Sequence, residues 1–218
     1  MQPVVVHGIP GSPYVRMPLL ACEEKGAPYR LEAMQFGQNK TPDYLAKHPF
    51  GRIPVIEHDG FWLYESAAIV RYIDQMFDGP RLTPTDPQRQ ARMNQVMGIV
   101  DWYVMPTVSA GIGFNRIIAP MIGRAVDEAA VANAIPGATT AVRALEQLLG
   151  KQAFMAGDDI SLADLMLIAH LELFPTTPEG AEILRGSVLL GWIERMQARP
   201  SVQATETMKL MAAARRAS

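Results

Sequence analysis

The sequence predicts two domains, an α/β domain built on a four-stranded mixed sheet and an all-helical domain that follows it. Two observations support this prediction. Strand and helix signals alternate over roughly the first 80 residues, and only helical patterns follow residue 88. A chain of 218 residues is also long enough to bury a core in each of two such domains without disulfide bonds.

The first elements are a strand, a turn, a helix and a second strand. Three valines and a histidine at residues 4–7 precede a glycine, which predicts a short strand with a turn after it. Ser12 followed by Pro13 suits the N-cap and the first position of a helix, and a lysine–glycine pair at residues 25–26 suits its end. Residues 29–33 are then predicted to form the second strand.

A hairpin and a helix complete the first domain. Residues 54–57 and 61–63 flank a His-Asp-Gly turn at 58–60, and an Asp-Gly pair favours a tight hairpin. After Glu65 and Ser66, apolar side chains recur at helical spacing, at Ala68, Ile69, Tyr72, Ile73 and Met76. The order βαβ followed by ββα is that of a thioredoxin-like fold.

The domain boundary is predicted where the composition changes. Asp, Gly, Pro and Thr dominate the segment after residue 77, as in an interdomain linker. We therefore assign residues 1–78 to the α/β domain, residues 79–87 to a linker and residues 88–218 to the helical domain.

One helix is predicted at the centre of the second domain. Residues 162–173 are apolar nearly all round, which is typical of a buried helix. Ser161 and Asp164 before it form a capping box, which already explains a carboxylate in an apolar segment without a catalytic role. The last clear helix ends at residues 199–200, and the tail at 215–218 is predicted to be a fraying, solvated end.

Prolines and glycines predict interruptions in the long helical segments. Pro106 should bend its helix, and Gly111 with Gly113 suggests a local break. Pro136 and Gly137 predict a kink or two separate helices between residues 126 and 149.

Composition excludes several classes of partner and site. The net charge of −2 and the dispersed basic residues argue against a nucleic-acid-binding protein. The single cysteine, Cys22, excludes a disulfide framework, fits a reducing compartment and is expected to be buried filler deep in the first helix. No segment approaches the ~18 apolar residues of a membrane helix, and residues 1–8 lack a signal peptide, so we expect a cytoplasmic protein. Four histidines lack the spacing of a metal site, and no metal is predicted: His7, His48, His58 and His170.

Ser12 is the strongest candidate for chemistry. At an N-cap its hydroxyl would lie where backbone N–H groups point outward, beside the partial positive charge of the helix. A hydroxyl there can stabilise a thiolate and lower its pKa below the usual value of about 8.5. The alternative is an ordinary cap. Arg16 shares the helix face and would either orient Ser12 or be solvated.

Two further positions suggest binding of a small peptide. Pro54 at the start of a strand requires a strand start, an edge or a cis bond, and a cis bond would turn the backbone of Ile53 toward a ligand. Ser66 can cap the following helix while its N–H receives a carboxylate, and Glu65 can hold an ammonium, which together suit an α-amino acid end. The alternatives are an ordinary edge strand and an ordinary helix start.

The motifs, taken together, resemble those of soluble glutathione transferases. They occur in the family's order and at its intervals, and their style is nearest to the serine-using phi and tau classes. Residues 4–77 match segment by segment, and residues 156–165 and 192–202 resemble later helices of the family. The matching segments are Gly-Ile-Pro-Gly-Ser-Pro-Tyr-Val-Arg (8–16), Glu-Glu-Lys-Gly (23–26), Asn-Lys-Thr-Pro (39–42), His-Pro-Phe-Gly-Arg-Ile-Pro-Val (48–55) and Tyr-Glu-Ser-Ala-Ala-Ile (64–69).

This resemblance implies a role for each motif residue. It implies that Ser12 hydrogen-bonds the glutathione sulfur, with Tyr14 and Arg16 as supporting residues. It implies that the backbone of Ile53 grips the cysteinyl unit, and that Phe50 is a key in the dimer contact. The remaining implied ligands of glutathione are Glu65 and Ser66 for the γ-glutamyl end and Asn39, Lys40 and Arg52 for the glycyl carboxylate.

The function that the resemblance implies is conjugation of glutathione to a small apolar electrophile. Glutathione would be the co-substrate, no metal would be needed, and the protein would be a homodimer active in detoxification. The alternatives are a glutathione-dependent peroxidase or isomerase, and a non-catalytic protein that binds apolar ligands. Ser12 argues against the last, because a binding module has no need of a hydroxyl that activates a thiolate.

Overall fold

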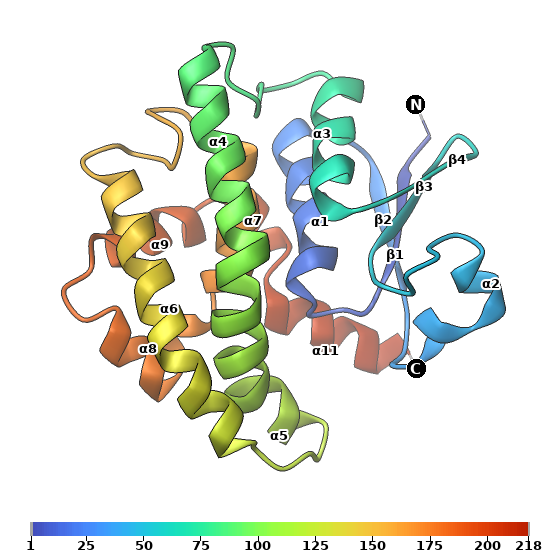
Figure 1. Cartoon of the computed structure of the whole chain (residues 1–218). Coiled ribbons are helices and arrows are strands. Elements are labelled where there is room, and N and C mark those ends of the chain that lie inside the picture. The colour runs from blue at the N-terminus through green and yellow to red at the C-terminus, as the bar shows by residue number, and fades with distance from the viewer. Residues whose placement is uncertain (1, 218) are drawn as a thin grey trace. The chain divides into compact units, whose positions relative to one another are not determined.

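The computed structural model describes residues 2–217, so Met1 and Ser218, and what the sequence predicts for them, lie outside the described part. The chain forms two compact units (Figure 1). One contains the residues up to Leu82 together with those from Ala198 on, and the other spans Thr83–Gln197. The last segment thus packs with the first unit, which differs from the expected assignment of residues 88–218 to a single helical domain.

The first unit is built on a four-stranded mixed sheet with the order β2-β1-β3-β4. The strands are β1 (Val4–Gly8), β2 (Tyr29–Ala33), β3 (Val55–His58) and β4 (Phe61–Tyr64). β1 pairs parallel with β2, and the pairs β1–β3 and β3–β4 are antiparallel. Asp59 and Gly60 both have positive φ in the β3–β4 turn, as a tight hairpin requires. The predicted sheet and hairpin are confirmed.

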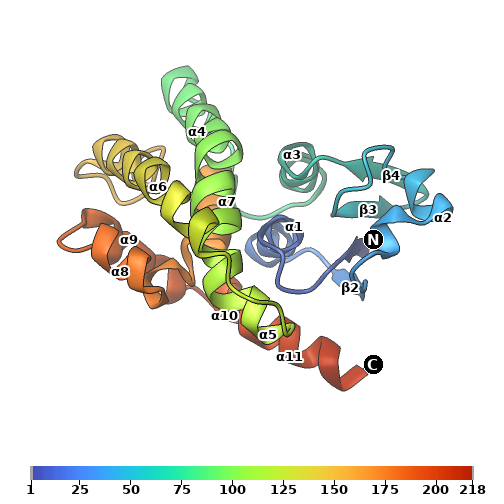
Figure 2. The ribbon, with the colours of Figure 1, turned by 60° about the horizontal axis from the view of Figure 1, so that its bottom comes forward.

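Two helices of the first unit cover one face of the sheet. They are α1 (Pro13–Lys25) and α3 (Ser66–Met76), which contact each other. The short helices η1 (Gln38–Lys40) and α2 (Pro42–Leu45) join β2 to β3, and α2 lies on the side away from α1 and α3 (Figures 1 and 2). The core between sheet and helices is aliphatic and fully buried, with Val4, Val6, Leu19, Ile56, Ile69 and Ile73 among its members.

The C-terminal segment completes the first unit with two more helices. They are α10 (Pro200–Ala204), which contacts α1, and α11 (Thr207–Ala217). The described residues of the tail continue this helix, and the side chains of Arg215 and Arg216 are exposed, as predicted for a solvated end. The first residue of α11, Thr207, accepts a hydrogen bond from Arg16 of α1.

The second unit is helical throughout its regular structure. Its elements are α4 (Pro87–Ile99), η2 (Val100–Ile118), α5 (Ala119–Met121), α6 (Glu128–Leu149), α7 (Leu162–Leu171), η3 (Phe174–Thr176), α8 (Pro178–Ile183) and α9 (Val188–Gln197). Every residue of α7 is buried, and the helix contacts α4, η2 and α9, which confirms its predicted central place. Within the described residues, no helix is both long and apolar enough to cross a membrane.

The capping box before α7 is present and extends into the core. Asp164 accepts hydrogen bonds from the N–H and the hydroxyl of Ser161, at 3.0 and 2.8 Å, and from the N–H of Met155 and the indole of Trp192, at 2.9 and 3.0 Å. Burial raises the pKa of this carboxyl, and the four donated hydrogen bonds oppose that rise. The structural interpretation of Asp164 is confirmed.

Of the two alternatives predicted near Pro136, a kink or two helices, the second is wrong, because α6 is a single helix from Glu128 to Leu149. Likewise η2, a wide helix of the π type, continues through Pro106 and the two glycines. The glycines serve close packing between η2 and α6 instead. A Cβ at Gly111 would lie 2.4 Å from that of Ala134, and one at Gly137 would lie 2.6 Å from Cγ2 of Thr107. This contact outweighs the local penalty of a proline inside a helix.

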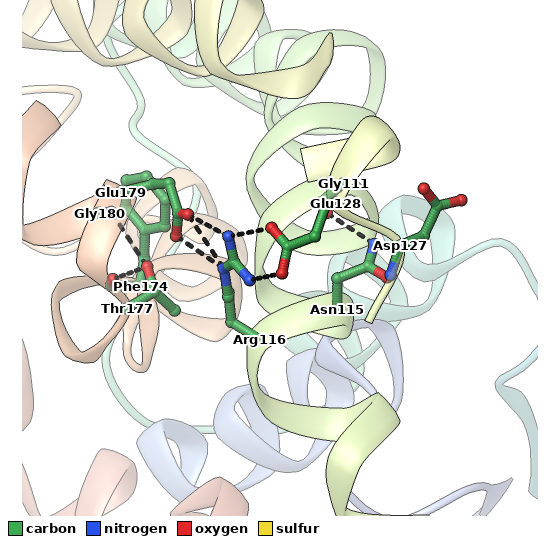
Figure 3. A network of polar contacts seen from close by, with 9 residues as sticks. All are labelled: Gly111, Asn115, Arg116, Asp127, Glu128, Phe174, Thr177, Glu179 and Gly180. Carbon is green, nitrogen blue, oxygen red and sulfur yellow. Dashed lines mark hydrogen bonds and ion pairs between the residues drawn. The ribbon is translucent and has the colours of Figure 1, made fainter. Parts of the chain in front are cut away.

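One arginine joins three helices of the second unit (Figure 3). Arg116 of η2 donates to both carboxylate oxygens of Glu179, in the first turn of α8, with the shortest contact at 2.6 Å. It also donates two hydrogen bonds of 2.8 Å to Glu128, in the first turn of α6. Both carboxylates therefore lie at helix N-termini, where negative charge is favourable.

Candidate active site

Ser12 lies at the N-cap of α1, with extended backbone and Pro13 at the first helical position, as predicted. Its carbonyl accepts the first helical hydrogen bond, from the N–H of Arg16 at 3.0 Å. Its hydroxyl makes no capping hydrogen bond and is half-buried. The first turn of α1 also contains no acidic residue. The positive end of the helix and the hydroxyl are therefore both available to an anion.

Arg16 is buried, not solvated, with 1% of the residue exposed. Its guanidinium donates to the carbonyl of Val202 at 3.1 Å and to the hydroxyls of Thr205 and Thr207, both at 3.4 Å. Of the two predicted alternatives for Arg16, the solvated one is thus wrong. Arg16 ties the first turns of α1 to the C-terminal segment, and sequence could not show this because its acceptors lie more than 180 residues away.

The peptide bond between Ile53 and Pro54 is cis, and the strand β3 begins at Val55. Ile53 is half-buried, and no hydrogen bond within the described residues uses its backbone N–H or C=O. The preceding residue, Arg52, is exposed, and its carbonyl accepts a 2.8 Å hydrogen bond from the hydroxyl of Tyr44. This bond fixes the loop that presents Ile53.

Asn39 and Lys40 meet at a single acceptor. The side-chain amide of Asn39 and the ammonium of Lys40 donate to the carbonyl of Gly51, at 2.7 and 2.9 Å. Gly51 has a φ of 57°, and a Cβ there would lie 2.9 Å from the ammonium of Lys40 and from the carbonyl oxygen of Asn39. Glycine is therefore required both by the backbone and by the close approach of these two residues.

Glu65 and Ser66 begin α3 in an arrangement that differs from the expected one. Glu65, not Ser66, is the N-cap, and it is exposed. Ser66 is the first helical residue, and its hydroxyl donates to the carbonyl of Tyr14 at 3.4 Å. The expected capping by Ser66 is therefore wrong. The contact with Tyr14 instead brings the start of α3 beside the start of α1, two residues beyond Ser12.

His48, which the sequence predicts not to bind a metal, contacts one of the candidate residues, Phe50. The ring of His48 stacks on Tyr64 at 4.6 Å and meets Phe50 edge-on at 6.1 Å. Burial lowers the pKa of His48, the charge of Glu65 opposes this, and the charges of Arg52 and Lys40 add to it. The charges of Glu65, Arg52 and Lys40 thus all act on this ring.

Phe50 makes edge contacts with two rings of this aromatic group. Two thirds of it, 66%, is exposed, with ring centroids 6.1 Å from His48 and 6.4 Å from Tyr64. Cys22 is fully buried, and burial raises its pKa to about 12, so it remains a neutral thiol. Among the described residues, no group of three or more His, Cys, Asp or Glu side chains could hold a metal ion.

Comparison with known proteins identifies the family. The model of the glutathione S-transferase N-terminal domain matches residues 6–81, and that of the C-terminal domain matches residues 128–195. Glutathione S-transferase 4 of Zea mays is 30% identical over 91% of this chain and 89% of its own length. The chain belongs to the glutathione S-transferase family.

Other relatives of this transferase agree with that assignment. Glutathione S-transferase F14 of Arabidopsis thaliana is 31% identical over 88% of this chain and 78% of its own. Among solved structures, glutathione transferase F7 of Populus trichocarpa has a TM-score of 0.84 at 27% identity, covering 95% of this chain and 99% of that one. A maize glutathione S-transferase I in complex with an atrazine glutathione conjugate has a TM-score of 0.83 at 26% identity, covering 97% and 99%. The predicted family, fold class and transferase activity are confirmed.

Proposed function

We propose that this transferase conjugates glutathione to small apolar electrophiles, with Ser12 donating a hydrogen bond to the glutathione thiolate. The observation that carries the proposal is the position of Ser12, at the N-cap of α1 with a hydroxyl that makes no capping bond. The contact between Ser66 and Tyr14 supports it, because it brings the proposed amino-acid grip close to the same helix start. Relatives that carry a glutathione conjugate or lactoylglutathione support the choice of ligand.

The proposed hydrogen bond is strong enough to shift the pKa of the glutathione thiol. A hydrogen bond to a charged group contributes about 1.5 to 3 kcal/mol, and one pKa unit corresponds to about 1.4 kcal/mol. Ser12 can therefore lower the thiol pKa by about one to two units. The N-terminus of α1 adds about 0.3 to 1 kcal/mol, and this contribution does not depend on the hydroxyl.

The other candidates bind parts of glutathione that lie away from the sulfur. In this proposal Glu65 receives the γ-glutamyl ammonium and the N–H of Ser66 its carboxylate, while the open backbone of Ile53 holds the cysteinyl unit. Asn39, Lys40 and Arg52 take the glycyl carboxylate. Asn39 and Lys40 already converge on the carbonyl of Gly51, so one acceptor pre-organises both donors.

The reaction needs no group beyond the thiolate and the electrophile. The thiol proton passes to solvent, the sulfur then bonds to an electrophilic carbon, and for a haloarene the halide leaves with its bonding electrons. The apolar electrophile and a role in detoxification follow from the family and form part of the proposal. The supporting role of Tyr14 and Arg16 is proposed through their contacts with Ser66 and the C-terminal segment.

The Ser12→Ala variant tests this proposal. We expect the pKa of bound glutathione to rise by about one to two units, and kcat/KM with a chloronitrobenzene to fall about 10- to 100-fold at pH 6.5, with a smaller loss at pH 9. Thiolate absorbance near 240 nm against pH measures the first quantity. Ser12→Thr, which keeps a hydroxyl, is the matched control and should retain part of the shift.

Other results would redirect the assignment. An unchanged titration in Ser12→Ala would contradict the role of Ser12, and Tyr14 would be tested next. Turnover of a hydroperoxide without conjugation would favour the peroxidase alternative, whereas glutathione binding without either activity would favour a ligand-binding protein.

We also propose that the transferase is a cytoplasmic, metal-independent homodimer. The unpaired, buried Cys22 supports a reducing compartment. The exposed ring of Phe50 supports a dimer, because an aromatic side chain held only at its edges can enter a pocket of a second copy.

A further inference from the structure

The residue before Ser12 is in contact with the C-terminal helix. Gly11 has a φ of 89°, and a Cβ there would lie 2.7 Å from both Cγ and Sδ of Met211. The thioether of Met211 therefore packs directly on the backbone of Gly11. Only glycine satisfies both this contact and the positive φ.

The C-terminal helix is held in this place by a buried charge. The guanidinium of Arg16 donates to Val202, Thr205 and Thr207, which precede Met211 along the chain. The hydroxyl of Thr205 is used again, because it donates to the carbonyl of Ser201 at 2.8 Å. Both Arg16 and Thr205 are almost completely buried. The start of α11 is thus fixed to α1 one turn below Ser12.

An ion pair strengthens the same attachment. Arg199 donates two hydrogen bonds, of 2.8 and 2.7 Å, to the carboxylate of Glu24, and the hydroxyl of Ser201 also donates to it. Burial alone would raise the pKa of Glu24, but these hydrogen bonds outweigh it and lower the pKa. Arg16 and Glu24 therefore anchor the C-terminal segment near opposite ends of α1.

We propose that Met211 forms an apolar wall beside the sulfur bound at Ser12 and so influences which electrophiles the site accepts. This inference rests on the function proposed above and adds to it a specificity-determining residue on α11. A methionine is unbranched and polarizable, and it makes favourable contacts with aromatic rings. The wall would therefore favour aromatic electrophiles over small aliphatic ones.

The test compares two substitutions at position 211 with a matched change nearby. Met211→Gln keeps the length of the side chain but makes it polar, whereas Met211→Leu keeps it apolar. Met208→Gln introduces the same change on the same helix at a side chain that is 39% exposed. The substrates are glutathione with a chloronitrobenzene and glutathione with a small unsaturated aliphatic aldehyde.

We expect Met211→Gln to lower kcat/KM for the aromatic substrate about two- to tenfold relative to the aliphatic one, which is the range of a sulfur–aromatic contact. The KM for glutathione should not change. Met211→Leu, which keeps an apolar side chain but lacks the sulfur, should restore part of the ratio, and Met208→Gln should match the wild type.

Two outcomes would overturn the inference alone. One is an unchanged ratio of the aromatic to the aliphatic kcat/KM in Met211→Gln. The other is an equal loss of kcat/KM for both electrophiles, which would indicate a structural role for α11. A wild-type enzyme that conjugates neither substrate would contradict the proposed function itself, and this inference with it.

Discussion

Glu65 adopts a backbone conformation that few residues other than glycine adopt, with φ 71° and ψ 108°. Such a conformation costs on the order of 1 to 3 kcal/mol and persists only where the surrounding structure enforces it. The carbonyl of Glu65 accepts the first two helical hydrogen bonds of α3, both at 2.9 Å. The strained residue is thus also the start of the helix, and it is one of the proposed glutathione ligands.

Glu65→Ala should impair glutathione binding more than the chemical step. The proposed contact lies at the γ-glutamyl end, so it stabilises the bound ground state and the transition state equally. We expect the KM for glutathione to rise about 10- to 100-fold, the range for a lost hydrogen bond to a charged group, with kcat little changed. Steady-state kinetics measure both constants.

Glu194→Ala, at an exposed glutamate on α9, is the control for this prediction. If Glu65→Ala instead lowered kcat at an unchanged KM, the assignment of Glu65 to the γ-glutamyl end would be wrong.

Sequence patterns within one helical turn predict the place of some residues of the fold and the site, but not of others. Ser12 with Pro13, and Ser161 with Asp164, could be placed because capping depends on residues within one helical turn. Gly51 as the shared acceptor, and the partners of Arg16, could not be predicted, because these acceptors come from distant segments. Sequence patterns predict Ser66 as the cap of α3, one residue too late, because Glu65 takes a backbone conformation that sequence does not reveal.

At the scale of elements, the network around Arg116 links η2 to the starts of α6 and α8 (Figure 3). Hydrogen bonds from Arg116 lower the pKa of Glu179 and Glu128 more than burial raises them. Because both folded-state values lie below the unfolded value of about 4.3, the network stabilises the fold fully above that pH. Its contribution disappears as the pH falls through the folded values.

Arg116→Gln should therefore be less stable than the wild type at pH 6 to 7, and the difference should shrink below about pH 4. Thermal unfolding of both proteins across this range measures the difference in Tm. Arg185→Gln is the control, since its partner Glu182 lies only three residues away and both side chains are largely exposed. A pH-independent difference for Arg116→Gln would contradict the ionic origin of the effect.

Sequence patterns are insufficient to predict whether a helix continues through a proline. Pro136 has a local penalty that predicts a break, yet α6 continues because Gly111 and Gly137 allow it to pack closely on η2. The buried character of α7 was predictable, because an all-round apolar pattern has only one stable location.

At the scale of the whole molecule, the proposed dimer depends on Phe50. We expect Phe50→Ala to shift the dimer toward monomers. In the proposed dimer Phe50 is buried, and truncating a buried aromatic side chain removes about 3 to 5 kcal/mol of stabilisation. Sedimentation velocity at micromolar concentration measures the shift. Phe36→Ala, at another exposed phenylalanine of the first unit, is the control. A wild-type monomer under these conditions would rule out the proposed dimer.

The pairing of the sheet could be predicted from the order of its elements, whereas the place of the C-terminal segment could not. The attachment of residues 200–217 depends on Arg16 and Glu24, which look like ordinary surface charges in the sequence. Contacts of this kind become visible only once both partners are placed.

The same attachment determines when the glutathione-binding unit can be completed during synthesis. A ribosome produces roughly 5 to 20 residues per second, so the acceptors for Arg16 emerge many seconds after α1 itself. Until Val202, Thr205 and Thr207 have been translated, the guanidinium must stay hydrated, and α11 cannot close over Gly11. The first unit to emerge is thus the last to be finished, and a nascent chain released early would lack part of the wall beside Ser12.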